Sequence, residues 1–157
     1  MGVGSNPQQV LQTKLDIGCG SRKVNSEYIG LDIIKHTNID IIASATALPF
    51  KNESFIEVHT RRCIQHIEED EKVLTEVFRV LQKNGKATVI VASWTGWLFF
   101  KVRWLLKNKP YNVFHFYTFN KIARMLRKHE FHLINIGKIK SIHKFGYDIV
   151  AESKKQS

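Results

Sequence analysis

The stretch that decides the fold is Leu15-Asp16-Ile17-Gly18-Cys19-Gly20, in which a short apolar run leads into two glycines one residue apart. Because glycine has no Cβ, the backbone at such a turn can come close to a ligand. A second run, Ile29-Gly30-Leu31-Asp32-Ile33, carries an acid near its end, where a carboxylate can accept hydrogen bonds from two ribose hydroxyls. The two runs predict neighbouring strands with a nucleoside-binding turn after the first.

The same turn argues against a dinucleotide. A GxGxxG motif needs a third glycine, and Lys23 stands at that position. Only eight residues, 21–28, separate the second glycine from the second run. A crossover that contains a helix needs about 10–12 residues. A pyrophosphate would therefore find no helix N-terminus here, and the sequence disfavours NAD.

Further along the chain, strand-like and helix-like segments alternate, which is typical of an open, mainly parallel α/β sheet. Strands are expected over residues 14–17, 28–33, 39–42, 55–60, 86–92, 131–140 and 145–152, and helices over residues 69–81, 94–107 and 118–128. Asn84-Gly85 is predicted to end the first helix, and Thr118 to cap the last. The final two strands have no helix between them, so they are expected to pair antiparallel.

Length and composition indicate one globular domain, residues 14–154, after a short tail, residues 1–13. No apolar run approaches the roughly 20 residues that span a bilayer, and no signal peptide is visible at the N-terminus. The two cysteines, Cys19 and Cys63, lack the spacing of a zinc site or a disulfide framework. We therefore expect a cytoplasmic protein without a metal site.

The charge is unevenly distributed along the chain. Residues 79–157 contain 16 Lys/Arg against 3 Asp/Glu, a net charge of +13, whereas residues 1–78 have a net charge of −3. Such a basic half attracts anions, so nucleic acid or another anionic surface is an expected partner, with a solvated lysine-rich surface as the alternative.

In the order and spacing of its motifs the chain resembles the class I S-adenosylmethionine-dependent methyltransferases, in a compact form related to methyltransferase type 11. The motifs that carry the resemblance, over residues 14–154, are the two runs quoted above, Ala47-Leu48-Pro49-Phe50, Asn52-Glu53-Ser54-Phe55, Ile64-Gln65-His66-Ile67, residues 74–76 and residues 79–85. The resemblance implies a Rossmann-like α/β sheet of order 3-2-1-4-5-7-6, with an antiparallel last strand and helices on both faces.

It also implies roles for individual residues in binding S-adenosylmethionine. The implied cofactor-binding residues are Asp16, Gly18, Cys19 and Gly20 at the amino-acid end, Asp32 at the ribose, Ala45 and Leu48 beside the adenine, and Arg62 beside the methionine moiety. Two positions depart from the family pattern: Ser44 stands where relatives usually carry an acid that binds the adenine amino group, and Ile56 replaces an acid at the start of the fourth strand. The usual N-terminal helices are also missing.

Methyl transfer requires alignment of the acceptor more than side-chain chemistry, and a general base only where the acceptor loses a proton. His115 and Tyr117, ahead of the last helix, are the candidate catalytic residues because the family's acceptor pocket usually lies there. His66 is more typical of a structural role in its motif. The aromatic and basic segment 94–107 is interpreted as a lid over an apolar pocket, an interfacial helix or oligomer contact, or a surface for nucleic acid.

Two functional hypotheses remain open at this point. The chain is either a methyltransferase that acts on a small, lipid-like or anionic acceptor such as RNA, or a methyltransferase-like module with weak or no catalysis. In the second case its basic half would bind nucleic acid or a protein partner.

Overall fold

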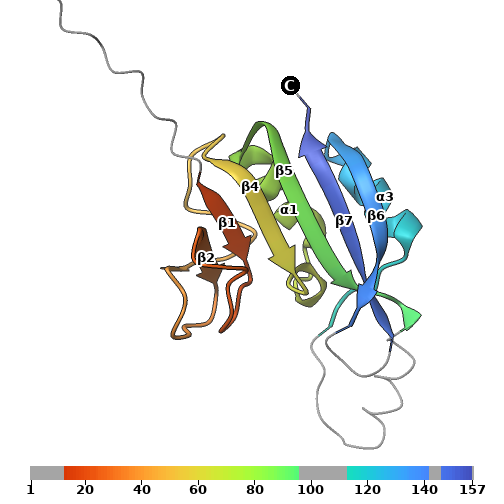
Figure 1. Ribbon diagram of the computed structural model, residues 1–157, viewed down its shortest axis with the longest axis horizontal. Helices are drawn as coiled ribbons and strands as arrows, with labels where there is room; N and C mark the ends of the chain where they lie inside the picture. The colour runs from red at the N-terminus through yellow and green to blue at the C-terminus, as the bar shows by residue number, and fades with distance from the viewer. Residues whose placement is uncertain (1–12, 96–112, 142–145, 157) are drawn as a thin grey trace, which may run out of the picture.

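Seven strands form one sheet in the computed structural model, which describes residues 13–95, 113–141 and 146–156 (Figure 1). The strands are β1 (Lys14–Ile17), β2 (Tyr28–Asp32), β3 (Ile41–Ile42), β4 (Phe55–Arg61), β5 (Leu81–Ala92), β6 (Phe131–Lys140) and β7 (Tyr147–Lys155). Their order in the sheet is β3-β2-β1-β4-β5-β7-β6. β1 to β5 pair in parallel, while β7 runs antiparallel to both β5 and β6. The order and the antiparallel strand expected from the sequence are confirmed.

Within the described residues, three helical segments accompany the sheet: the 3₁₀ helix η1 (Ile64–His66), α1 (Asp70–Val80) and α3 (Phe119–Lys128). Each α-helix buries an apolar stripe, made by Val73, Val77 and Val80 in α1 and by Ile122 and Leu126 in α3. The hydroxyl of Thr118 accepts a hydrogen bond from the backbone N–H of Lys121 and caps α3, as expected. The helix expected over residues 94–107 lies outside the described residues, apart from positions 94 and 95.

The bounds predicted for the first helix, 69–81, agree with α1 to within one residue, but the prediction that Asn84-Gly85 ends it was wrong. α1 ends at Val80, and β5 begins at Leu81, which pairs with Phe55 before the register shifts. Asn84 has a φ of 62°, and a Cβ on Gly85 would lie 2.8 Å from the carbonyl oxygen of Gln82. The Asn-Gly pair therefore forms an irregularity within the strand, because the backbone geometry that favours glycine also occurs at β-bulges.

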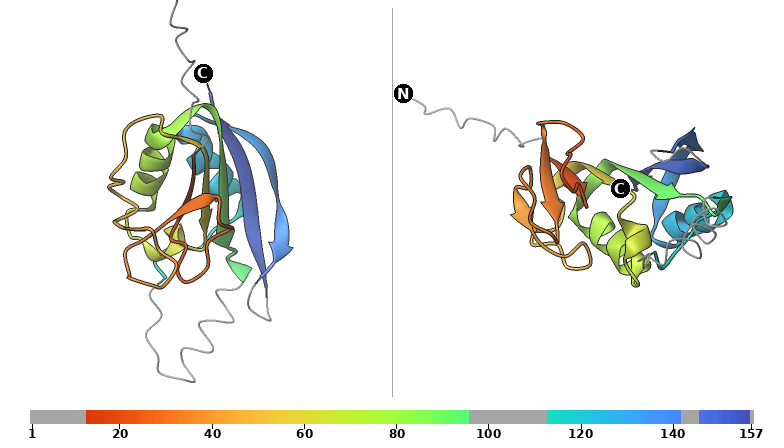
Figure 2. Two further views of the ribbon diagram at one scale, coloured as in Figure 1. Left: turned by 60° about the vertical axis from the view of Figure 1, so that its left-hand side comes forward. Right: turned by 90° about the horizontal axis from the view of Figure 1, so that it is seen from below.

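Both described α-helices lie on the same face of the sheet, as all three views agree (Figures 1 and 2). In the described part of the chain the segments after β1 and β2 form turns rather than helices. Polar side chains occupy the other face instead, where Lys14, Glu57 and Lys86 are aligned across β1, β4 and β5. Lys86 also forms an ion pair of 2.8 Å with Glu152. We therefore find the expected helical cover on one face only, within the residues described.

The turn after β1 is fastened to β2 by its backbone. The N–H groups of Gly18 and Cys19 both donate to the carbonyl oxygen of Leu31, at 2.7 Å and 3.2 Å. Leu15, Ile17 and Leu31 are almost fully buried in the core on the helical face. The first two strands therefore hold the glycine turn at the carboxyl edge of the sheet.

None of the described helices is long and apolar enough to cross a bilayer.

Candidate functional site

A cavity of about 530 Å³ opens at the carboxyl ends of β1, β2 and β4. Ligands bind at this edge in open parallel sheets, and the volume is in the range of small-molecule sites. Its wall is made by Gly18, Leu31, Asp32, Ile33, Ile34, Ala43, Ser44, Ala45, Thr46, Arg62, Cys63, His66, Ile67, Glu68 and Glu69. Four of the eight predicted cofactor-binding residues are therefore in the wall: Gly18, Asp32, Ala45 and Arg62.

The two glycines of the turn are needed for different reasons. Both have positive φ angles, 67° at Gly18 and 56° at Gly20, which side chains rarely adopt. A Cβ on Gly18 would lie 2.3 Å from the Sγ atom of Cys63, so the close approach at this position is to the protein itself. A Cβ on Gly20 would have no heavy atom within 4 Å. Neither Cys19 nor Gly20 is among the residues that line the cavity, although the space beside Gly20 is open.

Asp32 lies at the end of β2 with both carboxylate oxygens oriented by backbone donors. Its Oδ2 atom accepts from the N–H of Gly20 at 2.9 Å, and its Oδ1 atom accepts from the N–H of Ile34 at 3.0 Å. Each oxygen keeps a further lone pair. The carboxylate, which is half-buried in the cavity wall, can therefore accept hydrogen bonds from a pair of hydroxyls on a ligand.

Asp16 is buried and holds the glycine turn from outside the cavity wall. Its Oδ2 atom accepts from the N–H of Val24 at 2.9 Å, which closes the turn, and its Oδ1 atom lies 3.1 Å from Nδ1 of His59. His59 was not singled out from the sequence. The alternation of side chains along a strand could have indicated it, because His59 lies two residues after Glu57 and therefore on the same polar face of β4.

The wall after β3 is a run of small residues, Ala43 to Thr46, and the same cavity is lined by Ile33 and Ile34. Leu48 does not belong to it. The Leu48 side chain is 5% exposed in the core, and its backbone N–H donates to Oε2 of Glu76 at 2.7 Å. The sequence analysis expected both Ala45 and Leu48 to border a nucleobase. Of these two residues, only Ala45 lines the cavity.

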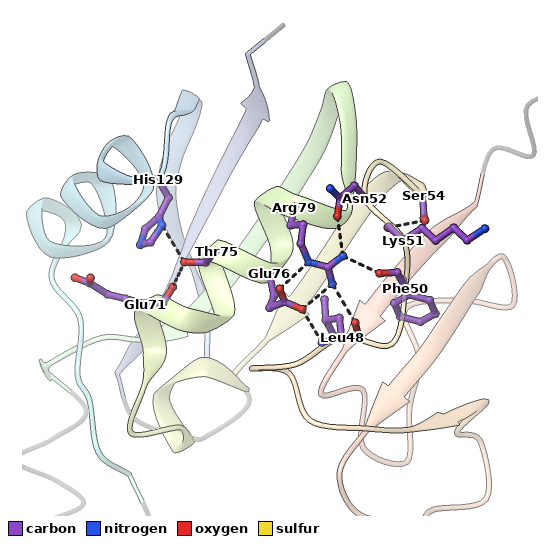
Figure 3. A network of polar contacts seen from close by, with 10 residues as sticks. All are labelled: Leu48, Phe50, Lys51, Asn52, Ser54, Glu71, Thr75, Glu76, Arg79 and His129. Carbon is purple, nitrogen blue, oxygen red and sulfur yellow. Dashed lines mark hydrogen bonds and ion pairs between the residues drawn. The ribbon is translucent and has the colours of Figure 1, made fainter.

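Arg79 and Glu76 fix the loop that contains Leu48 (Figure 3). The Arg79 guanidinium donates to the carbonyl oxygens of Leu48 and Phe50, at 3.0 Å and 2.7 Å, and to Oδ1 of Asn52. It also forms two hydrogen bonds with the Glu76 carboxylate. These bonds from Arg79 hold the pKa of Glu76 below its usual range. The helix α1 thereby positions the loop that continues the cavity wall.

Arg62 lines the cavity, and its charge is paired with an acid from another strand. It follows β4 with a φ of 56°, and its N–H donates to the carbonyl oxygen of Ile90. The guanidinium instead binds Asp148 on β7, at 2.7 Å and 3.1 Å, and the hydroxyl of Ser141. The buried carboxylate of Asp148 neutralises this guanidinium within the protein. The position of Arg62 beside a methionine moiety stays a prediction.

His115 and Tyr117, the predicted catalytic residues, are not in the cavity wall. Tyr117 is fully buried, and its hydroxyl donates to Oδ2 of Asp70 at 2.9 Å. Burial, together with that carboxylate, raises the pKa of Tyr117 well above its usual value. His115 lies with Nε2 2.8 Å from the carbonyl oxygen of Glu68. The catalytic prediction for Tyr117 is therefore wrong on grounds of access, and His115 has a local structural partner.

Both thiols near the site are held in their neutral form. Burial and the carboxylates of Asp16 and Asp32 raise the pKa of Cys19 to about 11 and that of Cys63 to about 12. A thiolate is the nucleophilic form of cysteine. Cys63 lines the cavity, but its thiol is suited to packing against Gly18 rather than to attack on a substrate. No cluster of His, Cys, Asp and Glu suited to a metal ion occurs within the described residues.

Comparison with known proteins adds to this geometry. Residues 15–89 match a family model described as a methyltransferase domain. An S-adenosylmethionine-dependent methyltransferase from Methanosarcina mazei is 17% identical, with a TM-score of 0.75 and 92% of each chain covered. A 1,6-didemethyltoxoflavin-N1-methyltransferase from Burkholderia thailandensis, solved with bound S-adenosylhomocysteine, is 13% identical, with a TM-score of 0.71 and coverage of 92% and 71%. The [4+2]-cyclase SpnF is 12% identical with a TM-score of 0.67, over 92% of this chain and 74% of its own.

Proposed function

We propose that the chain is a class I S-adenosylmethionine-dependent methyltransferase, which transfers the methyl group of this cofactor to an acceptor molecule. One observation carries the proposal: a cavity of about 530 Å³ joins the glycine turn to Asp32, whose carboxylate is oriented toward a ligand by two backbone donors. The fold alone is weaker support, because unrelated chemistry can occupy one fold.

The residues present fit an adenosine that carries an amino-acid side arm. The open space at Gly20 admits a ligand close to the backbone. Asp32 would accept hydrogen bonds from the ribose hydroxyls, while Ile33 and Ala45 would enclose the base. The cofactor supplies an electrophilic methyl group on sulfur. The contribution of this chain is to orient the ribose and to exclude water, so that an acceptor atom approaches in line.

An acceptor that loses a proton needs a base within reach, and the cavity wall offers His66, Glu68 and Glu69. They take the place that the sequence gave to His115 and Tyr117. An acceptor atom that carries no proton would need none of them. The proposed mechanism therefore relies on alignment first and on these wall residues only for acidic acceptors.

The charge distribution favours an anionic acceptor or partner. Arg124 and Arg127 on α3, with Lys138 and Lys140 on the edge strand β6, are exposed. None of the four has an ion pair with an acidic residue in the described part of the chain. A nucleic acid would match this surface. The same surface supports the second candidate function, a methyltransferase-like module that binds an anionic partner without catalysis.

Calorimetry with S-adenosylmethionine and S-adenosylhomocysteine separates the two functions. We expect micromolar binding that falls at least about 100-fold in Asp32→Ala, because two charge-assisted hydrogen bonds are worth about 1.5–3 kcal/mol each. Glu27→Gln, an exposed acid remote from the cavity, is the matched control and should bind like the wild type. Absence of binding to either compound, with binding of RNA that weakens steeply with salt, would favour the module.

A further inference from the structure

The wall after β3 presents two hydroxyls held in a fixed relation. The Oγ atom of Ser44 lies 2.8 Å from Oγ1 of Thr46, and it also accepts a hydrogen bond from the Thr46 backbone N–H at 3.2 Å. Both side chains are half-buried, and both residues line the cavity. The residues between and before them, Ala45 and Ala43, have side chains too small to cover the pair.

Such a pair offers a ligand a donor and an acceptor at once. If Ser44 donates to Thr46, the Thr46 hydroxyl hydrogen is free and Ser44 keeps a lone pair; if Thr46 donates, the roles are exchanged. Either arrangement leaves one O–H group and at least one lone pair directed away from the pair. An ionised carboxylate in the same place would accept only.

The position of the pair is suited to the edge of a base. Ile33 and Ile34 directly follow Asp32, line the same cavity and leave 67% and 62% of their surfaces exposed. Large apolar side chains left exposed in a cavity favour contact with an apolar face such as a planar ring. A nucleoside whose ribose is bound by Asp32 would therefore place its base in the part of the cavity that these isoleucines and Ser44 line.

We propose that the hydroxyl pair of Ser44 and Thr46 binds the six-membered-ring edge of a purine without distinguishing a 6-amino from a 6-oxo group. A 6-aminopurine offers a donor at N6 and an acceptor at N1, and a 6-oxopurine offers the reverse. The pair satisfies both patterns by exchanging its internal hydrogen bond. The site thus accepts inosine-type as well as adenosine-type homocysteine thioethers, an inference that rests on the proposed cofactor site.

The test compares S-adenosyl-L-homocysteine with S-inosyl-L-homocysteine by calorimetry on the full chain. We expect the two dissociation constants of the wild type to agree within about fivefold. In Ser44→Asp the ratio should move at least about tenfold in favour of the adenosyl compound, because a 6-oxo group would face a second acceptor. Removing both hydroxyls, in Ser44→Ala/Thr46→Val, should weaken both compounds by a common factor of about 2–10. Ser54→Ala, an exposed hydroxyl outside the cavity, is the matched control.

Each outcome bears on a different statement. Binding of neither compound by the wild type would overturn the cofactor site itself. Strong wild-type preference for the adenosyl compound, above about 50-fold, would overturn the inference while leaving the cofactor site intact. Unchanged affinities in the double variant would also overturn it, because the hydroxyls would then make no contact with the base. The wild-type ratio decides the matter even if Ser44→Asp does not fold.

Discussion

The imidazole of His59 and the carboxylate of Asp16 form a side-chain pair across β4 and β1, with Nδ1 3.1 Å from Oδ1. The other oxygen of Asp16 accepts from the N–H of Val24. One buried carboxylate therefore connects the middle of the sheet to the far end of the glycine turn. The geometry of the turn depends on a residue, His59, that is remote from it in sequence.

We expect His59→Leu to weaken binding of S-adenosylhomocysteine about 3–10-fold and to lower the melting temperature. The substitution leaves a buried carboxylate oxygen without its partner, which costs about 1–3 kcal/mol, part of it in the turn. His59→Asn places an amide N–H near the position of Nδ1 and should recover most of the affinity. Calorimetry and thermal unfolding measure both effects, and unchanged affinity in His59→Leu would contradict the connection.

Gly18→Ala should destabilise the protein by about 2–4 kcal/mol. Its Cβ would lie 2.3 Å from Sγ and 2.4 Å from Cβ of Cys63, and its φ is positive; overpacking costs about 1–3 kcal/mol and the backbone strain about 1. Gly20→Ala, with a similar φ but no neighbour within 4 Å, should cost only the strain. Urea denaturation measures both.

The double variant Gly18→Ala/Cys63→Gly distinguishes packing from strain. Removing the Cys63 side chain eliminates the collision but not the positive φ of residue 18. We therefore expect the double variant to lose less unfolding free energy than the two single variants lose in sum. Simple additivity in this cycle would show that the contact with Cys63 is not what requires glycine at position 18.

The pair of Glu76 and Arg79 should make stability depend on pH. The hydrogen bonds of Arg79 lower the pKa of Glu76, so its contribution is full above the usual glutamate range and is lost as the pH falls through the folded-state pKa. The difference in unfolding free energy between wild type and Glu76→Gln should therefore shrink from pH 7 toward pH 3. A constant difference over that range would contradict the assignment.

The two thiols should react slowly with iodoacetamide in the native state. Because their pKa values are raised to about 11 and 12, little thiolate is present at pH 8, whereas in unfolded chains a cysteine has a pKa near 8.5. Alkylation followed by mass spectrometry should show faster labelling in urea than in buffer for both residues. Equal rates in the two conditions would contradict the raised pKa values of Cys19 and Cys63.

Local sequence was sufficient for much of the fold. The bounds of β1 and β6 were predicted without error, and the cap at Thr118 was correct, because strand alternation and N-capping are properties of a few adjacent residues. The beginning of β5 was missed since Leu81 is placed by its partner Phe55, and helical and strand patterns overlap there. The resemblance to a family supplied the strand order, which alternation alone does not determine.

The site was predicted less completely because its contacts join distant parts of the chain. Gly18 and Asp32 were placed in the cavity wall from the spacing of their motif. The partners of Arg62 and Tyr117, Asp148 and Asp70, lie 86 and 47 residues away in sequence. No local sequence pattern indicates whether an arginine side chain contacts a ligand or a buried acid. Likewise, no local pattern indicates whether a tyrosine next to a helix faces a cavity or the core.

The order of the last strands has a consequence for synthesis on the ribosome. β7 follows β6 in the chain but lies between β5 and β6 in the sheet. Until residues 147–155 have emerged, β5 has an unpaired edge, β6 has no strand to join, and Arg62 lacks Asp148. The nascent chain would thus expose an aggregation-prone β edge until β7 has emerged, so the strand that follows β6 in the chain is the one that completes the sheet.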